Sequence, residues 1–166
     1  MKRLIAGLLL TLMLTAGCGA AHKIAAKVSC LSTVRTWYKS GGKADSDALK
    51  SALLAVGRAD RAAGKAHFTP ATVSAVKAKT GALSAAIARF GSDLPPGCVS
   101  GVRADMKAGL ADFRKAVTDQ DAAVAAARGN DAAGVQQAFT RAASAFKAGA
   151  VKFLAVGAAV KKYLAH

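Results

Sequence analysis

Residues 69–97 read TPATVSAVKAKTGALSAAIARFGSDLPPG, the pattern of an amphipathic helix followed by a proline-containing loop. Thr69 is a good N-cap and Pro70 is favoured at the first helical position, so a helix is expected to begin there. Its apolar residues return at alternating steps of three and four, which indicates a helix that buries one face. Thr80 is the polar member of this seam, and its hydroxyl can bond to a backbone carbonyl one turn earlier. The seam consists of Val73, Val76, Thr80, Leu83, Ile87 and Phe90.

A proline pair marks the end of this helical stretch. Pro95 and Pro96 cannot stand inside a helix, so the segment around them is a loop. Helical spacing returns after the loop and predicts a helix from about Val99 to Arg128. A turn at 129–131 then leads into a last helix that runs close to the C-terminus.

The chain before residue 69 is helical by the same criterion. One helix is expected over about 22–39, and Gly41 with Gly42 is expected to stop it. A second helix begins near Ser46 or Asp47, both good N-caps, and ends around Gly64. No segment alternates with the period of two that a strand needs. The sequence therefore predicts an all-α, up-down antiparallel helical bundle over 23–166, with four long helices and a short first helix.

The N-terminus has the order of a secretory signal: a basic pair, an apolar run and small residues. The run is too short for a membrane span of about 20 residues. The ending Thr15-Ala16-Gly17-Cys18 resembles the lipobox of bacterial lipoproteins. That resemblance implies a signal peptide over 1–17, diacylglycerol on Cys18, an acyl chain such as palmitate on the new amine, and a lipidated tether over 18–22. It places the protein on the extracytoplasmic face of the cell membrane. An ordinary signal cut after Ala21 is the alternative.

The three cysteines fit this interpretation. Lipidation consumes Cys18 and leaves Cys30 and Cys98 free to pair in an oxidising compartment. A disulfide that closes a loop of about 70 residues contributes roughly 4 kcal/mol in the chain-entropy model. Two buried free thiols are the alternative. A zinc site is disfavoured, because two cysteines without neighbouring histidines do not complete a tetrahedral set.

A second resemblance covers most of the mature chain. It rests on Cys30, on Trp37 seven residues later, on the Gly41-Gly42 pair, and on the Pro95-Pro96-Gly97-Cys98 run before an alanine-rich hairpin. The pattern is similar to that of uncharacterised secreted or lipid-anchored helical proteins of high-GC actinobacteria. The resemblance implies a fold and a compartment and brings no activity with it.

Residues that would support catalysis or metal binding are few. All nine acidic residues are aspartate, so the Glu and Glu-x-x-His sets of metal-binding bundles are absent from the sequence. His22, His67 and His166 stand at the tether, at a turn and at the terminus. Asp105, Asp112 and Asp119 repeat every seven residues, and this spacing favours a salt-bridge ladder over acid–base chemistry. We therefore expect no enzyme, no metal and no cofactor.

Charge is the broad functional signal. Without Lys2 and Arg3, 22 of the 24 basic residues remain against nine aspartates, a net charge of +13. Such a field attracts polyanions, although no motif for reading nucleic acid is present. The expected function is a non-catalytic, lipid-anchored envelope protein that binds anionic lipids or phosphate-bearing wall polymers, or that has a structural role. The expected anion-binding residues are Lys147, Lys152, Lys161 and Lys162.

The alternative function is a carrier of a small hydrophobic ligand in the bundle interior. Trp37 and Tyr38 would line its pocket, although a lone tryptophan beside a disulfide more often fills a core. A cavity of several hundred Å³ would favour this alternative.

Overall fold

The computed structural model describes residues 26–165, and within that range the chain is helical with no strand. A helix over 26–37 continues through a π-helical turn, η1 (Tyr38–Gly42), into α2 (Lys43–Lys65). There follow α3 (Pro70–Ser92), a short 3₁₀ turn η2 (Gly97–Val99), α4 (Ser100–Arg128) and α5 (Ala132–Leu164). The expected all-α bundle is confirmed. The signal peptide, Cys18 and the tether lie outside the described residues.

The predicted break at Gly41 and Gly42 is wrong, because the chain stays helical through both glycines. Gly42 is buried, and a Cβ atom placed on it would lie 2.6 Å from Cε2 of Trp37. The glycine therefore makes room for an indole ring and does not end a helix. The short first helix is the N-terminal arm of one long, bent helix, and a π turn accommodates the bend.

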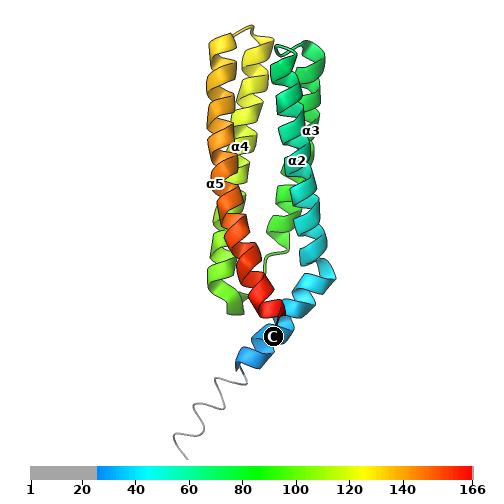
Figure 1. Cartoon of the computed structure of the whole chain (residues 1–166), viewed down its shortest axis with the longest axis vertical. Coiled ribbons are helices and arrows are strands. Elements are labelled where there is room, and N and C mark those ends of the chain that lie inside the picture. The colour runs from blue at the N-terminus through cyan, green and yellow to red at the C-terminus, as the bar shows by residue number, and fades with distance from the viewer. Residues whose placement is uncertain (1–25, 166) are drawn as a thin grey trace, which may run out of the picture.

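The four long helices run antiparallel and pack in chain order: α2 on α3, α3 on α4, and α4 most closely on α5. Figure 1 shows the α2–α3 and α4–α5 turns at one end, here called the turn end. The C-terminal end of α5 lies at the other end, called the disulfide end, beside the first helical residues. The fourth side, between α2 and α5, has almost no close backbone approach.

All six seam positions of α3 are buried, which confirms the period read from residues 69–97. Thr80 Oγ1 donates to the carbonyl oxygen of Val76 at 2.9 Å, as the seam pattern predicts. The main hydrophobic cluster combines Leu83, Ile87 and Phe90 of this seam with apolar side chains of α2, α4 and α5, while Val73 and Val76 belong to a smaller cluster nearer the turn end. Its fully buried large members are Leu49, Val56, Leu83, Ile87, Phe90, Met106, Leu110 and Phe113.

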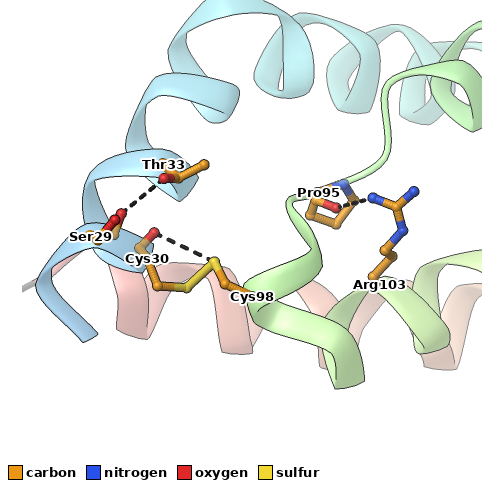
Figure 2. Close-up of a disulfide and its surroundings, with 6 residues drawn as sticks. All are labelled: Ser29, Cys30, Thr33, Pro95, Cys98 and Arg103. Atoms are coloured by element: carbon orange, nitrogen blue, oxygen red, sulfur yellow. Dashed lines mark hydrogen bonds between the residues drawn. A yellow bond between two sulfur atoms is a disulfide. The ribbon is translucent and has the colours of Figure 1, made fainter. Parts of the chain in front are cut away.

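A disulfide joins Cys30 to Cys98, with their Cα atoms 5.8 Å apart, so the predicted bridge is confirmed. It pins the N-terminal arm to the start of α4 at the proline loop (Figure 2). Two further bonds hold that loop: Arg103 Nη1 donates to the carbonyl oxygen of Pro95, and Trp37 Nε1 donates to that of Asp93. The end of the bundle where the chain enters is thereby fixed at three points.

Helices α4 and α5 approach closely because glycines face each other across the interface. A Cβ atom on Gly149 would lie 2.5 Å from the Phe113 ring, and one on Gly109 would lie 2.8 Å from the Phe153 ring. Each phenyl ring occupies the space that the opposite glycine leaves open. Gly109 and Gly149 therefore allow the close packing of α4 on α5.

Candidate functional site

An apolar groove lies at the disulfide end, where the described chain begins and α5 ends. It encloses about 990 Å³ between the N-terminal arm, the first turn of α4 and the last turns of α5. Its charged lining residues are Lys27 and Lys162, both exposed, so cations flank a floor of small and branched apolar side chains. The lining residues are Lys27, Val28, Leu31, Val102, Ala155, Ala158, Ala159, Lys162 and Tyr163. This arrangement suits a ligand or surface that is apolar within and anionic at its edge.

The outer face of α5 continues this apolar surface. Val151 is 60% exposed and Leu154 is 74% exposed, and Val28 on the N-terminal arm is 61% exposed. By length and composition α5 is the one helix among the described residues that could cross a membrane, with a mean hydropathy of 1.4 over its most apolar stretch. Only 22% of that stretch is fully buried, although its larger side chains, such as Phe146 and Phe153, pack partly against the core. Exposed apolar area of this kind marks a surface for contact with a partner or with lipid.

A second cavity, of about 1000 Å³, opens on the fourth side of the bundle, near the turn end. Its walls come from α2, from both turns and from α5. Three phenyl rings line it, and two of them, Phe68 and Phe139, stack with centroids 5.2 Å apart. The lining includes Gly57, Asp60, Arg61, His67, Phe68, Asn130, Asp131, Val135, Gln136, Phe139, Ala143 and Phe146.

A polar relay starts at this cavity and runs into the core. Gln120, fully buried on α4, donates from Nε2 to Oδ2 of Asp60 at 2.5 Å. Thr80 Oγ1 shares its one proton between Oε1 of Gln120, at 2.6 Å, and the carbonyl oxygen of Val76, and so completes the chain. Oδ1 of Asp60 is buried and has no hydrogen-bond partner among residues 26–165. Burial raises the pKa of the Asp60 carboxyl to about 6, against smaller lowering effects of the Gln120 hydrogen bond and the Arg61 charge.

The α2–α3 turn that overhangs this cavity has an uncommon backbone. His67 and Phe68 both have positive φ angles, 50° and 56°. Such angles are rare for bulky side chains and mark a strained turn. The turn is held by a hydrogen bond from Phe68 N to the carbonyl oxygen of Ala63, and it sets the Phe68 ring against Phe139 of α5.

The structure separates the residues expected to form sites. Trp37 is 9% exposed and packs in the main core, with Tyr38 against it, and neither residue lines the groove or the cavity. Lys147, Lys161 and Lys162 are exposed, as expected of an anion-binding surface. Lys152 differs, because it is half-buried and its Nζ lies 2.5 Å from Oδ2 of Asp112.

The aspartate repeat on α4 is a salt-bridge ladder at two of its three positions. Asp112 pairs with Lys152, and Asp119 pairs with Lys115 and with Arg141. Burial pushes the pKa of Asp119 upward, but hydrogen bonds from Lys115 and Arg141 outweigh it and leave the pKa below its usual value. The ladder ties α4 to α5 and engages two of the three carboxylates of the repeat in ion pairs.

The sequence analysis missed Asp60 and Gln120, although a signal for both was present. Asp60 follows Val56 by four residues, so it occupies a seam position of α2. Gln120 fills the seam position that Val117 and Val124 leave between them on α4. A polar residue at a seam position on three neighbouring helices, counting Thr80, predicts that the three meet.

Within residues 26–165, no three histidine, cysteine or aspartate side chains come together in a group able to hold a metal ion. The chain matches no protein-family model, no curated protein and no solved structure in the comparisons made.

Proposed function

We propose that this chain is a non-catalytic, lipid-anchored protein of the cell envelope whose disulfide end rests on an anionic bilayer. The observation that carries the proposal is the apolar groove flanked by Lys27 and Lys162 at the end where the chain enters the bundle. The lipobox-like sequence that ends at Cys18 supports the anchor.

The distance between anchor and groove fits this arrangement. Cys18 precedes Ala26 by eight residues, which span at most about 30 Å even when fully extended. The disulfide then fixes the arm that carries Lys27 and Val28 to the start of α4. A lipid on Cys18 would hold the groove close to the headgroups, because a longer excursion is beyond the reach of the tether.

The chemistry of the end surface suits a bilayer interface. Lys161 and Lys162 stand in the last turn of α5, and each basic side chain near an anionic membrane contributes about 1 kcal/mol. Tyr163 in the groove and the exposed Leu154 supply apolar area for the interfacial region. Many weak contacts of both kinds would hold the domain against the membrane, and phosphate-bearing wall polymers would compete for the cations.

The test is binding of a soluble form, starting at residue 18 with Cys18→Ser, to vesicles of phosphatidylcholine with or without phosphatidylglycerol. The variant Lys161→Gln/Lys162→Gln should weaken binding to the anionic vesicles by about tenfold or more. The matched control is Lys77→Gln/Lys79→Gln, which removes the same charge from exposed positions in the half of α3 nearer the turn end.

We expect this control to bind nearly as well as the unchanged domain. Equal losses in the two variants would mean that binding reflects net charge alone. Absence of binding to anionic vesicles at low salt would refute the proposal for the surface. The anchor is tested separately, by mass spectrometry of the N-terminal peptide of the full chain expressed in a bacterium that processes lipoproteins.

A further inference from the structure

The side of the bundle between α2 and α5 is open in a way that the other three sides are not. Helices α2 and α5 hardly approach each other, and the second cavity occupies the space between them near the turn end. Its volume of about 1000 Å³ is at the upper end of the range for sites that take a small organic molecule. The membrane proposal concerns the opposite end of the molecule, so this cavity is a separate feature.

The wall of this cavity contains a carboxylate with unused bonding capacity. Asp60 accepts one hydrogen bond, from Gln120 to Oδ2, while its Oδ1 is buried with no partner among the described residues. An unpaired buried carboxylate oxygen is unfavourable, because it has lost water without gaining another donor. Such a group in a cavity wall needs a donor from outside the chain, and a molecule bound in the cavity can supply it.

The other charged groups of the cavity do not donate a hydrogen bond to Oδ1 of Asp60. Arg61 and His67 are exposed and belong to the rim of the cavity at α2 and the α2–α3 turn. Asp131 accepts the backbone N–H of Gly134 with Oδ1 and so caps α5. No charged side chain of α5 lines the cavity. An anionic ligand would therefore meet two aspartates, with Arg61 as an exposed cation beside them, and a neutral ligand without a donor would leave Asp60 Oδ1 unsatisfied.

The rest of the lining is aromatic and aliphatic. The Phe68, Phe139 and Phe146 rings stand beside Val135 and Ala143, which is the lining expected for a hydrocarbon or aromatic body. Ring faces also attract a cation held near them. The strained turn at His67 and Phe68 keeps one of these rings in place over the opening.

We propose that the cavity between α2 and α5 binds an apolar molecule that carries a positively charged amine, with the amine on Asp60 and the apolar body along Phe68, Phe139 and Phe146. The class includes alkylamines and hydrophobic aromatic amines. The polar relay through Gln120 to Thr80 holds the carboxylate at the wall and fixes the direction from which the amine is received.

The experiment uses three probes of equal chain length, decylamine, decanol and decanoate, with the soluble form of the whole mature chain in a calorimeter. We expect decylamine to bind most tightly and decanoate most weakly. Asp60→Asn should weaken decylamine binding by about tenfold or more and leave decanol binding nearly unchanged, since it removes a charge-assisted bond and keeps the shape. Asp105→Asn, at an exposed position of α4, is the matched control and should change neither.

A second variant tests the cavity itself. Ala143 is an exposed lining residue of α5, so Ala143→Phe should fill the cavity without disturbing the core, and it should weaken decylamine and decanol alike. Circular dichroism verifies that each variant is folded. Decanoate binding as tightly as decylamine, or decylamine binding that Asp60→Asn leaves unchanged, would overturn the assignment of the amine. Absence of binding by all three probes, or binding that Ala143→Phe does not weaken, would overturn the site.

Discussion

Gln120 on α4 donates a hydrogen bond of 2.5 Å to Asp60 on α2. This bond links two helices that are not neighbours in the chain and have few or no close backbone contacts. The bond leaves one carboxylate oxygen buried without a partner. A buried carboxylate that is only partly satisfied favours its protonated form, which explains why burial raises its pKa to about 6.

Asp60 should therefore make the protein less stable as the pH rises through its pKa. The folded chain holds this proton up to about pH 6, whereas the unfolded chain releases it near 3.8. The contribution of the group is fully present below pH 3.8 and is lost between there and pH 6. Asp60→Asn removes this dependence. Relative to the unchanged protein it should gain about 1–2 kcal/mol between pH 4 and pH 7, after a reduction for the partial exposure of the group.

Urea unfolding of both proteins at the two pH values measures this gain. A difference in unfolding free energy that stays constant with pH would show that Asp60 ionises in the folded state as it does in the unfolded chain. His67 lines the same cavity, so the comparison is repeated in a His67→Gln background to separate the contribution of the neighbouring imidazole.

The disulfide should account for a large share of the stability. Cys30→Ser/Cys98→Ser opens a loop closed by residues 68 apart, which corresponds to about 4 kcal/mol in the chain-entropy model. A loss of that size lowers the melting temperature of a domain this large by roughly 10 °C. Thermal melts followed by circular dichroism give the shift. Hydrogen exchange should show the greatest loss of protection in the N-terminal arm, and a uniform loss along the chain would contradict its role as a local pin.

The contact between Gly149 and Phe113 predicts opposite effects for two glycine substitutions in α5. Gly149→Ala places a Cβ atom 2.5 Å from the Phe113 ring and 3.0 Å from the carbonyl oxygen of Gly109. Neither neighbour yields easily, so the substitution should destabilise the protein by about 1–3 kcal/mol. Gly157→Ala meets nothing within 4 Å and should stabilise it by roughly 0.5–1 kcal/mol, because alanine is the better helix former. Denaturant titrations of both variants test the pair, and equal effects would contradict the packing.

Sequence patterns predicted the features that can be recognised from local spacing or from composition. The seam of α3, the proline loop and the Cys30–Cys98 pair follow from local spacing and from the number of cysteines. The meeting of Asp60 and Gln120 depends on how two helices are rotated toward each other, and no single-helix pattern contains that information. It could be predicted only by comparing the polar seam positions of α2, α3 and α4 with one another. The ion pair of Lys152 with Asp112 could not be predicted for the same reason, because it joins two helices.

Glycine at 41–42 was interpreted as a helix stop because the sequence does not reveal a tertiary neighbour. Glycine is frequent after a helix end, but it is also used where a large side chain must come close to a backbone. Here Trp37 lies against Gly42 within one helix, and the helix continues through a π turn.

This pair of glycines gives a sharp test of that explanation. A Cβ atom on Gly42 would lie 2.6 Å from two atoms of the Trp37 ring, which is rigid and enclosed by the core. A Cβ atom on Gly41 would lie 2.7 Å from the Oδ2 atom of Asp93, which is the end of a side chain that can rotate away. Gly42→Ala should therefore lower the free energy of unfolding by about 1–3 kcal/mol, whereas Gly41→Ala should be close to neutral.

Trp37 is the only tryptophan in the chain, so its fluorescence reports on this site directly. Gly42→Ala should shift the emission to longer wavelength as the indole loses its enclosed position, and Gly41→Ala should leave it unchanged. Equal stability of the two variants, with the same emission, would contradict the close packing of Trp37 against Gly42.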